Sequence, residues 1–266
     1  MEKELHISLA AEPLFHIGSF AVTNSLLVTW LVMVALIIFG VLVGRSPKVG
    51  APKGWQNVIE YVFELLIGLM ESVTQSREKA EKFFPFLTTF FLFIFVANMT
   101  DIIPGIGTIG IEHVTEHGSE LVPFLRPPAS DLNFTVALAI ISVLTAQVFG
   151  VASLGFMQHA KKYFTIKGGP VYTFVGLLEL ISEIAKMVSF SFRLFGNIFA
   201  GEVLLTVIAV IVPFVVPLPF YFLEVFVAFV QALVFTMLSL VFFTVATTAH
   251  GEHAEKKAHS PSHANN

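Results

Sequence analysis

Residues 170–212 read PVYTFVGLLELISEIAKMVSFSFRLFGNIFAGEVLLTVIAVIV and form an apolar stretch far longer than the roughly 18 residues typical of a membrane-spanning helix. As a helix it would be about 64 Å long, roughly twice the thickness of the hydrocarbon core. It must therefore tilt strongly, or break into two spans near Arg193. A break needs a turn at SFSFRLFGN, which contains no proline and a single glycine, so we expect one strongly tilted helix.

The composition of the whole chain places it in the membrane. The chain has 266 residues, of which 55% are hydrophobic, with a mean hydropathy of +0.81 and 13% charged residues. Soluble domains carry about twice that share of charge. The net charge of −4 is too small to indicate a nucleic-acid partner. The absence of cysteine excludes disulfides, thiolate metal sites and cysteine nucleophiles.

The expected fold class is an all-α polytopic membrane protein with about five membrane-spanning helices. Apolar runs predict further spans near 20–43, 83–103, 134–156 and 217–247. Prolines separate the last two long stretches, which we expect to form a long, strongly tilted helical hairpin over about 170–247. The prolines of this break are Pro213, Pro217 and Pro219.

We expect one transmembrane helical domain, residues 20–247, between two polar ends. Residues 1–19 form an outer N-terminal segment whose glutamates do not resemble the basic start of a cleaved signal peptide, so the first span is expected to stay as an anchor. Residues 248–266 form a polar, low-complexity tail. Its histidines could bind a stray metal ion, but a disordered tail is the favoured interpretation, and no metal site is predicted.

Lysine and arginine in the short loops predict the orientation. The segment 44–82 and the loop 157–169 are basic, whereas the loop 104–133 carries several acids and Arg126. Because basic loops remain in the cytoplasm, the N-terminus is expected outside and the C-terminus inside, in a bacterial plasma (inner) membrane. The basic residues are Arg45, Lys48, Lys53, Arg77, Lys79, Lys82, Lys161, Lys162 and Lys167.

Residues 55–75 carry one narrow polar stripe on an otherwise apolar helix. The three glutamates in this stripe argue against a membrane crossing, and it lacks the lysines of a lipid-surface helix. We favour an interfacial amphipathic helix packed against protein, with a sixth span as the alternative. The sequence GIGTIG, residues 105–110, matches a dinucleotide-binding pattern, but it follows a membrane span and no parallel sheet can be built around it. It is interpreted as a flexible outer loop.

Ionisable residues inside the last two spans are the main functional signal, because each costs about 2.5–3.5 kcal/mol at the centre of a spanning helix. Arg193 lies near the middle of the long helix. Glu179, Glu183 and Lys186 lie towards its inner end, and Glu202 and Glu224 lie at a similar outer depth. At 100° per residue, Lys186 and Glu179 share the stripe of Arg193, whereas Glu202 points about 180° away. Asn197 and Gln231 add neutral polar groups.

Structural interpretations of these residues remain open at this point. Glu179 and Glu183 could extend to the interface, and Lys186 could pair with either of them. Glu202 and Glu224 could form a protonated pair. Arg193 could be a static hydrogen-bonding group that Asn197 orients one turn on.

In these residues the chain resembles subunit a of the F-type ATP synthase. The resemblance rests on RLFGN at 193–197, AGE ending at Glu202, and the spacing from Glu224 to Gln231. NMTDIIPG after the second span and DLN at Asp131 support it. The resemblance covers about residues 20–248 and implies a proton-translocating stator subunit within a complex that synthesises ATP.

The resemblance assigns roles residue by residue. It implies that Arg193 is the essential arginine facing a rotating ring of c subunits. Glu202 and Glu224, with Asn197 and Gln231 nearby, would form the outer proton path. Glu179 would belong to the inner path, to which we also assign Glu183 and Lys186. The family often has a histidine beside the outer acid, whereas both of these positions are glutamate here.

The implied partners are the c-subunit ring, b-type peripheral stalk subunits, the remainder of the ATP synthase and the lipid bilayer, without nucleic acid. We expect no cofactor and no catalytic site of the subunit's own, because no nucleophile–base pair or phosphate-binding loop is visible. A stand-alone ion-coupled secondary transporter is the main alternative, although we find no internal repeat of the kind those proteins show. A purely structural scaffold is the third interpretation, and it predicts that the buried charges tolerate neutral replacement.

Overall fold

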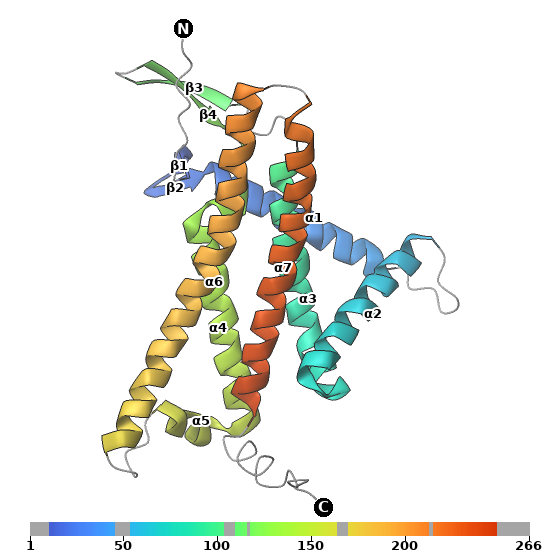
Figure 1. Ribbon diagram of the computed structural model, residues 1–266, viewed down its shortest axis with the longest axis vertical. Coiled ribbons are helices and arrows are strands. Elements are labelled where there is room, and N and C mark those ends of the chain that lie inside the picture. The colour runs from blue at the N-terminus through green and yellow to red at the C-terminus, as the bar shows by residue number, and fades with distance from the viewer. Residues whose placement is uncertain are drawn as a thin grey trace, which may run out of the picture.

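The computed structural model describes residues 11–45, 54–103, 110–115, 118–163, 170–212 and 215–248. Long helices dominate these residues, and two short strand pairs lie at one end (Figure 1). The elements are β1 Pro13–Ile17, β2 Phe20–Thr23, α1 Asn24–Gly44, α2 Trp55–Thr74, α3 Arg77–Met99, η1 Thr100–Ile102, β3 Gly110–Thr115, β4 Gly118–Pro123, η3 Pro128–Ser130, α4 Leu132–Leu154, α5 Phe156–Tyr163, α6 Pro170–Ile211 and α7 Pro217–Thr247.

Among the described residues, five helices are long and apolar enough to cross a membrane: α1, α3, α4, α6 and α7. The expected all-α polytopic class is thereby confirmed. The long stretch at 170–212 is one continuous helix of 42 residues, as expected, and it does not break near Arg193. The span expected from residue 83 begins earlier, at Arg77, because the Ser76 hydroxyl accepts a hydrogen bond from the Lys79 amide and caps the helix.

Helices α6 and α7 form the expected hairpin, with α4 and α3 packed against it (Figure 1). The turn between α6 and α7 lies at the end of the molecule that carries the strands, which we call the strand end. Helix α5 marks the opposite end, which we call the α5 end. Two buried hydroxyl pairs join α4 to the hairpin: Thr135 with Ser191 of α6 at 3.1 Å, and Ser142 with Ser239 of α7 at 2.7 Å.

Helices α1 and α2 cross obliquely beside this bundle (Figure 1). Helix α2 is not among the five apolar helices, in agreement with the interfacial interpretation of residues 55–75. Leu66 and Met70 of α2 are buried in the core, whereas Glu60 and Glu64 of the predicted polar stripe are exposed. The helix therefore has one packed face and one acidic face.

The strand pairs and α5 were not expected. Strands β1 and β2 lie across the boundary at residue 19 between the expected outer segment and the transmembrane domain, and β3 and β4 lie in the expected outer loop. Gly110, the last residue of GIGTIG, begins β3, whereas residues 104–109 lie outside the described residues. Helix α5 occupies part of the expected inner loop. Gly155 separates it from α4 with a φ of 81°, a backbone conformation that glycine adopts without strain.

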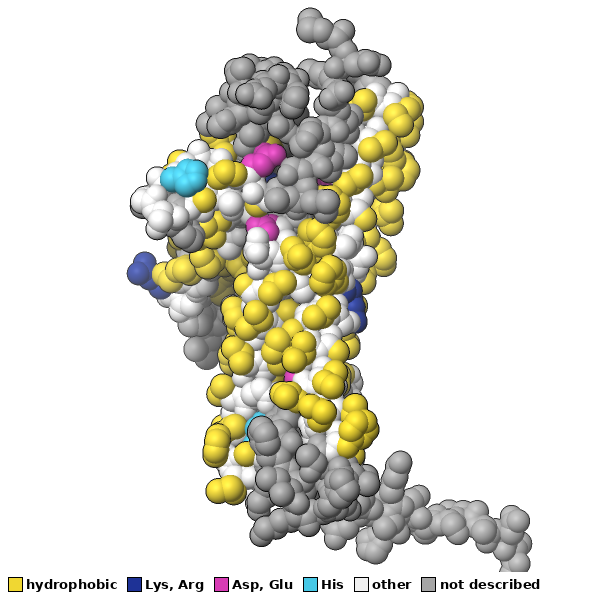
Figure 2. Space-filling view, turned by 90° about the vertical axis from the view of Figure 1, so that its left-hand side faces the viewer, with side chains coloured by type: hydrophobic (Ala, Val, Ile, Leu, Met, Phe, Trp, Pro, Cys, Tyr) yellow, Lys and Arg dark blue, Asp and Glu magenta, His cyan; other side chains and the backbone are white. Residues whose placement is uncertain are grey.

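One face of the molecule shows mainly apolar side chains along much of its length (Figure 2). Helix α6 contributes strongly to the exposed apolar surface of the chain, with Ile181, Ile184, Val188 and Phe192 all more than half exposed. Such a surface suits lipid or a neighbouring membrane subunit rather than water.

Candidate functional site

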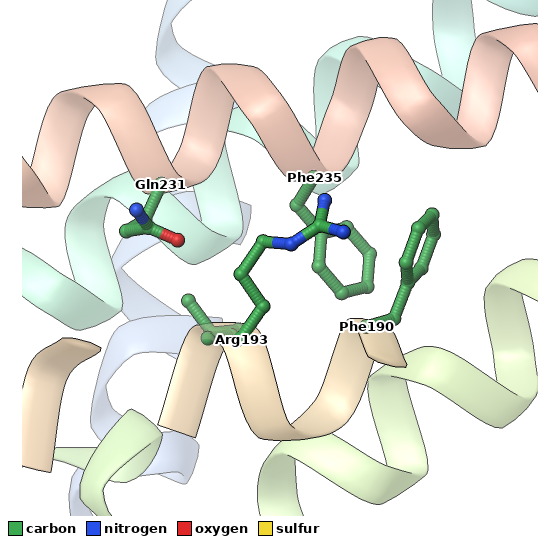
Figure 3. A pocket seen from close by; sticks show the side chains of 5 residues that line it. Phe190, Arg193, Gln231 and Phe235 are labelled. Atoms are coloured by element: carbon green, nitrogen blue, oxygen red, sulfur yellow. The ribbon is translucent and has the colours of Figure 1, made fainter. Parts of the chain in front are cut away.

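Arg193 lies in a groove between α6 and α7. Its side chain runs beside the rings of Phe190 and Phe235, and Gln231 of α7 points into the same pocket (Figure 3). Leu194 completes the lining, and the pocket has room for about one water molecule. The structure therefore brings together Arg193 and Gln231, two residues that the sequence placed on different helices.

Within the described part of the chain, no carboxylate forms an ion pair with Arg193. The Nη2 group donates a hydrogen bond to Ser189 Oγ at 3.3 Å, and Cζ lies 5.9 Å from the centre of the Phe190 ring. Ser189, one turn before Arg193, thus provides the contact that sequence reasoning had considered for Asn197. Arg193 and Asn197 are both exposed. The guanidinium is consequently held by weak contacts and remains accessible from outside the chain.

Glu202 forms an ion pair with Arg126, which the sequence had indicated only as a basic residue of the 104–133 loop. Its Oε1 lies 3.7 Å from Nε of Arg126. Arg126 is only 5% exposed, and its Nε donates a hydrogen bond to Ser130 Oγ at 3.1 Å. A buried arginine beside a carboxylate stabilises the charge on that carboxylate.

Glu224 of α7 approaches α6 across the hairpin, at the residue before Glu202. Its carboxyl group lies directly over Gly201, where a Cβ atom would come within 2.5 Å of Glu224 Cδ. Gly201 is thus required for the close contact of α6 with the acid of α7. Glu224 is 4% exposed, and its Oε1 has no hydrogen-bond partner among the described residues.

Asp101 of η1 is the third acid in this region. Electrostatic interactions connect it to Glu202, Glu224 and Arg126. We call these four residues the acidic cluster. The cluster contains three carboxyl groups and one guanidinium, which interacts with Glu202 and Asp101.

Two features of the sequence could have revealed Asp101 and Arg126. Asp101 is an acid at the end of an apolar span, a costly position that usually signals function. Arg126 is the single basic residue of the 104–133 loop, and it stands directly before two prolines that fix the backbone. Their meeting with α6 and α7 depends on tertiary packing, which spacing along the chain does not predict.

Towards the α5 end of α6, Glu183 and Lys186 form an ion pair at 2.8 Å. Nζ of Lys186 also lies 4.9 Å from the centre of the Phe242 ring of α7. Glu179 lies one turn before Glu183 and is partly exposed. Pairing of Lys186 with Glu183 or Glu179 was one of the structural interpretations left open, and the contact to Glu183 is present.

Arg193 separates these two groups of ionisable residues. Along α6, Glu202 lies about 14 Å from Arg193 towards the strand end, and Glu183 lies about 15 Å away towards the α5 end. Lys186 and Arg193 both face α7, whereas Glu202 faces Arg126 beside η3. The two groups are therefore displaced in depth and also around the helix, and no straight line of acids crosses the bundle.

This fold and site define a polytopic membrane protein with ionisable side chains placed at three depths along one helical hairpin. Residues 26–244 match the ATP synthase A chain family. The chain is 33% identical over 236 residues to ATP synthase subunit a of Geobacter sulfurreducens, covering 87% of this chain and 90% of that protein. It is 30% identical over 238 residues to ATP synthase subunit a of Moorella thermoacetica, covering 90% and 96%. ATP synthase subunit a of Campylobacter jejuni is 31% identical over 242 residues, covering 90% and 91%.

The chain therefore belongs to the ATP synthase A chain family. Membership places it in the F-type ATP synthase complex as the proton-translocating stator subunit, in a bacterial membrane that it crosses several times. The sequence-based resemblance to this family is confirmed.

Proposed function

We propose that the subunit provides two offset half-channels to a rotating c-ring and that Arg193 separates them. The observation that supports this best is the position of Arg193, exposed midway along α6 with no ion-pair partner among the described residues. A guanidinium at this depth needs a counter-charge, and a carboxylate on a neighbouring rotor would supply it.

The acidic cluster at the strand end would be the outer half-channel. Protons entering there would pass among Asp101, Glu202 and Glu224, with Gln231 next to Arg193 as the last polar group before the ring. Glu179, Glu183 and Lys186 would border the inner path. Asn197, exposed one turn from Arg193, would face the ring. With this assignment the strand end lies outside, and the end of α7 lies on the cytoplasmic side.

Arg193 would act on the rotor by electrostatic attraction. A protonated ring carboxyl group that reaches Arg193 would lose its proton, because the positive charge favours the ionised form. The ionised group would then pass Arg193 and take up a proton from the other half-channel. Each charge moved across the membrane provides about 2.3 kcal/mol per 100 mV, so a proton leak past Arg193 would lose that energy.

The exposed apolar face of α6 would be the ring-facing surface. Arg193 is exposed on the same helix, and a Cβ atom added at Gly196 would meet nothing within 4 Å, so the described part of the chain leaves both positions open to a neighbouring subunit. Helix α1, which also exposes many apolar side chains, would contact lipid or b-type stalk subunits. The subunit would have no catalytic site of its own and would take part in ATP synthesis only through the complex.

Replacement of Arg193 tests this proposal. In membrane vesicles containing the complete ATP synthase, Arg193→Ala is expected to abolish proton pumping driven by ATP. Arg193→Lys is also expected to fail, because an ammonium cannot replace the planar guanidinium. Glu202→Gln and Glu224→Gln should each reduce proton flux. Coupled pumping by Arg193→Ala vesicles would reject the proposed role of Arg193.

A further inference from the structure

A continuous set of aromatic contacts crosses the bundle between Arg193 and the Glu183–Lys186 pair. The Phe190 ring of α6 lies 5.0 Å from Phe235 and 5.1 Å from Phe242, both on α7. From Phe235 the contacts continue to Phe90 of α3 at 5.9 Å. We call six of the connected rings the aromatic layer: Phe86, Phe90, Phe190, Phe235, Phe242 and Phe243.

Each side of this layer carries one cation. Arg193 lies over Phe190 on the side of the strand end, and Lys186 lies over Phe242 on the side of the α5 end. Phe190 and Phe242 are stacked on each other with an interplanar angle of 21°. Ring faces attract cations, so the layer also holds both charged groups in place.

Four of the six rings are buried, namely Phe90, Phe190, Phe235 and Phe243, whereas Phe86 and Phe242 are partly buried and pack against the core. Phe190 is 3% exposed and Phe235 is 4% exposed, and both belong to the largest apolar core cluster of the described residues. The pocket beside Phe190 and Phe235 has room for about one water molecule, which is too little for a file of water molecules through the layer. Proton conduction requires a chain of hydrogen-bonding groups, and phenylalanine rings offer none.

The buried hydroxyl groups near the layer do not form such a chain. Thr135 pairs with Ser191, and Ser142 pairs with Ser239. Thr135 and Ser142 are seven residues apart on α4, which separates the two pairs by about 10 Å along the helix. This distance is several times the length of a hydrogen bond. Thr236 of α7 is also fully buried, but its hydroxyl group donates to the Ala232 carbonyl of its own helix and not to either pair.

We propose that the aromatic layer is the insulating barrier of the subunit, which prevents protons from passing directly between the two half-channels through the α3, α6 and α7 interior. This inference rests on the proposed half-channels. It assigns a separate task to each part of the barrier: the layer blocks the interior route, and Arg193 controls the exposed route beside the ring.

Proton leak through the complete enzyme tests the inference. Liposomes with the ATP synthase complex are given a membrane potential without ADP and phosphate, so that coupled turnover is blocked, and proton entry is followed with a pH-sensitive dye. Phe190→Ala and Phe242→Ala are expected to raise the leak about tenfold, equivalent to 1.4 kcal/mol of lost barrier. Phe242→Leu, which fills most of the same volume, should stay close to wild type.

Phe222→Ala is the matched control, because Phe222 lies on α7 but is 75% exposed. Co-purification of the complex and its ATP hydrolysis rate verify assembly of each variant. Assembled Phe190→Ala and Phe242→Ala complexes with wild-type leak would overturn the inference, as would an equal leak in Phe222→Ala.

A second measurement does not depend on how well the alanine variants assemble. The chain contains no cysteine, so a single thiol can be placed at Ser239, which is fully buried one turn after Phe235 on α7. The Ser239→Cys thiol is expected to resist a water-soluble maleimide added from either side of the membrane. Modification of this thiol in an otherwise unchanged complex would show that water enters the layer, and the inference would be wrong.

The two proposals can fail separately. An intact leak barrier in Phe242→Ala together with loss of pumping in Arg193→Ala would reject the aromatic layer alone. Conversely, a leaking Phe242→Ala together with normal pumping in Arg193→Ala would retain the layer and reject the role of Arg193.

Discussion

Gly201 gives the sharpest test of the close approach of the Glu224 carboxyl group to α6. A Cβ atom at this position would lie 2.5 Å from both Cδ and Oε1 of Glu224. Ordinary contacts between carbon atoms are 3.5–4.0 Å, so Gly201→Ala must displace the carboxyl group by about 1 Å. Glu224 is 4% exposed and has little free space into which it can move.

The expected loss follows from this displacement. Overpacking of a buried site costs about 1–3 kcal/mol. If the same free energy is lost from proton transfer through Glu224, the rate of ATP-driven pumping falls by about fivefold to more than a hundredfold. The double variant Gly201→Ala, Glu224→Asp should recover part of the rate, because aspartate withdraws the carboxyl group by one methylene.

Pumping is measured in inverted vesicles with a pH-sensitive dye and normalised to the amount of assembled complex. Gly40→Ala is the control, because Gly40 lies within a spanning helix and a Cβ there would meet nothing within 4 Å. If Gly201→Ala pumps at the wild-type rate, or if Gly40→Ala loses as much, the carboxyl group of Glu224 at Gly201 does not carry the proton path.

Three further predictions concern the buried or membrane-embedded cations Arg126, Lys186 and Arg193. Arg126→Ala should lower the thermal stability of the complex in detergent, because Glu202 loses its buried partner. Adding Glu202→Gln to the Arg126→Ala chain should restore part of that stability. Equal stability of the single and double variants would contradict this expectation. Lys186→Met should slow pumping less than Arg193→Ala does, because Lys186 is already neutralised by Glu183. The pumping rates of the two variants, measured side by side, test this expectation. Arg193→Met should raise the thermal stability of the isolated subunit in detergent while abolishing pumping, since the apolar side chain removes an unpaired charge; a lower melting temperature would count against it.

The sequence predicted the helical spans well, because length and hydropathy dominate in a membrane. The continuity of α6 followed from the absence of proline around Arg193, and the hairpin followed from the prolines after residue 212. The strand pairs were missed because each strand has only four to six residues, too few for a pattern to stand out. Helix α5 was missed for the same reason, with only eight residues.

The candidate site could be predicted along one helix but not between helices. Helical periodicity placed Lys186 on the stripe of Arg193, and both side chains lie against α7 in the structure. The same periodicity turned Glu202 away from that stripe, and its carboxylate indeed meets Arg126. That meeting, and the contact of Glu224 with Gly201, join segments far apart in the sequence, so no spacing rule could have indicated them.

Arg126 and Arg193 have different surroundings, and these indicate what each arginine does. Arg126 is enclosed, with a carboxylate and a hydroxyl group of its own chain as partners, so its charge is fixed and balanced within the subunit. Arg193 has a hydroxyl group and a ring face, neither of which can neutralise it. An interaction that is completed only when another subunit presents a carboxylate can be made and broken at each step of a rotor, whereas one completed within the chain cannot. The same unpaired charge that makes the isolated subunit costly to place in a membrane is therefore what allows it to act on a moving partner.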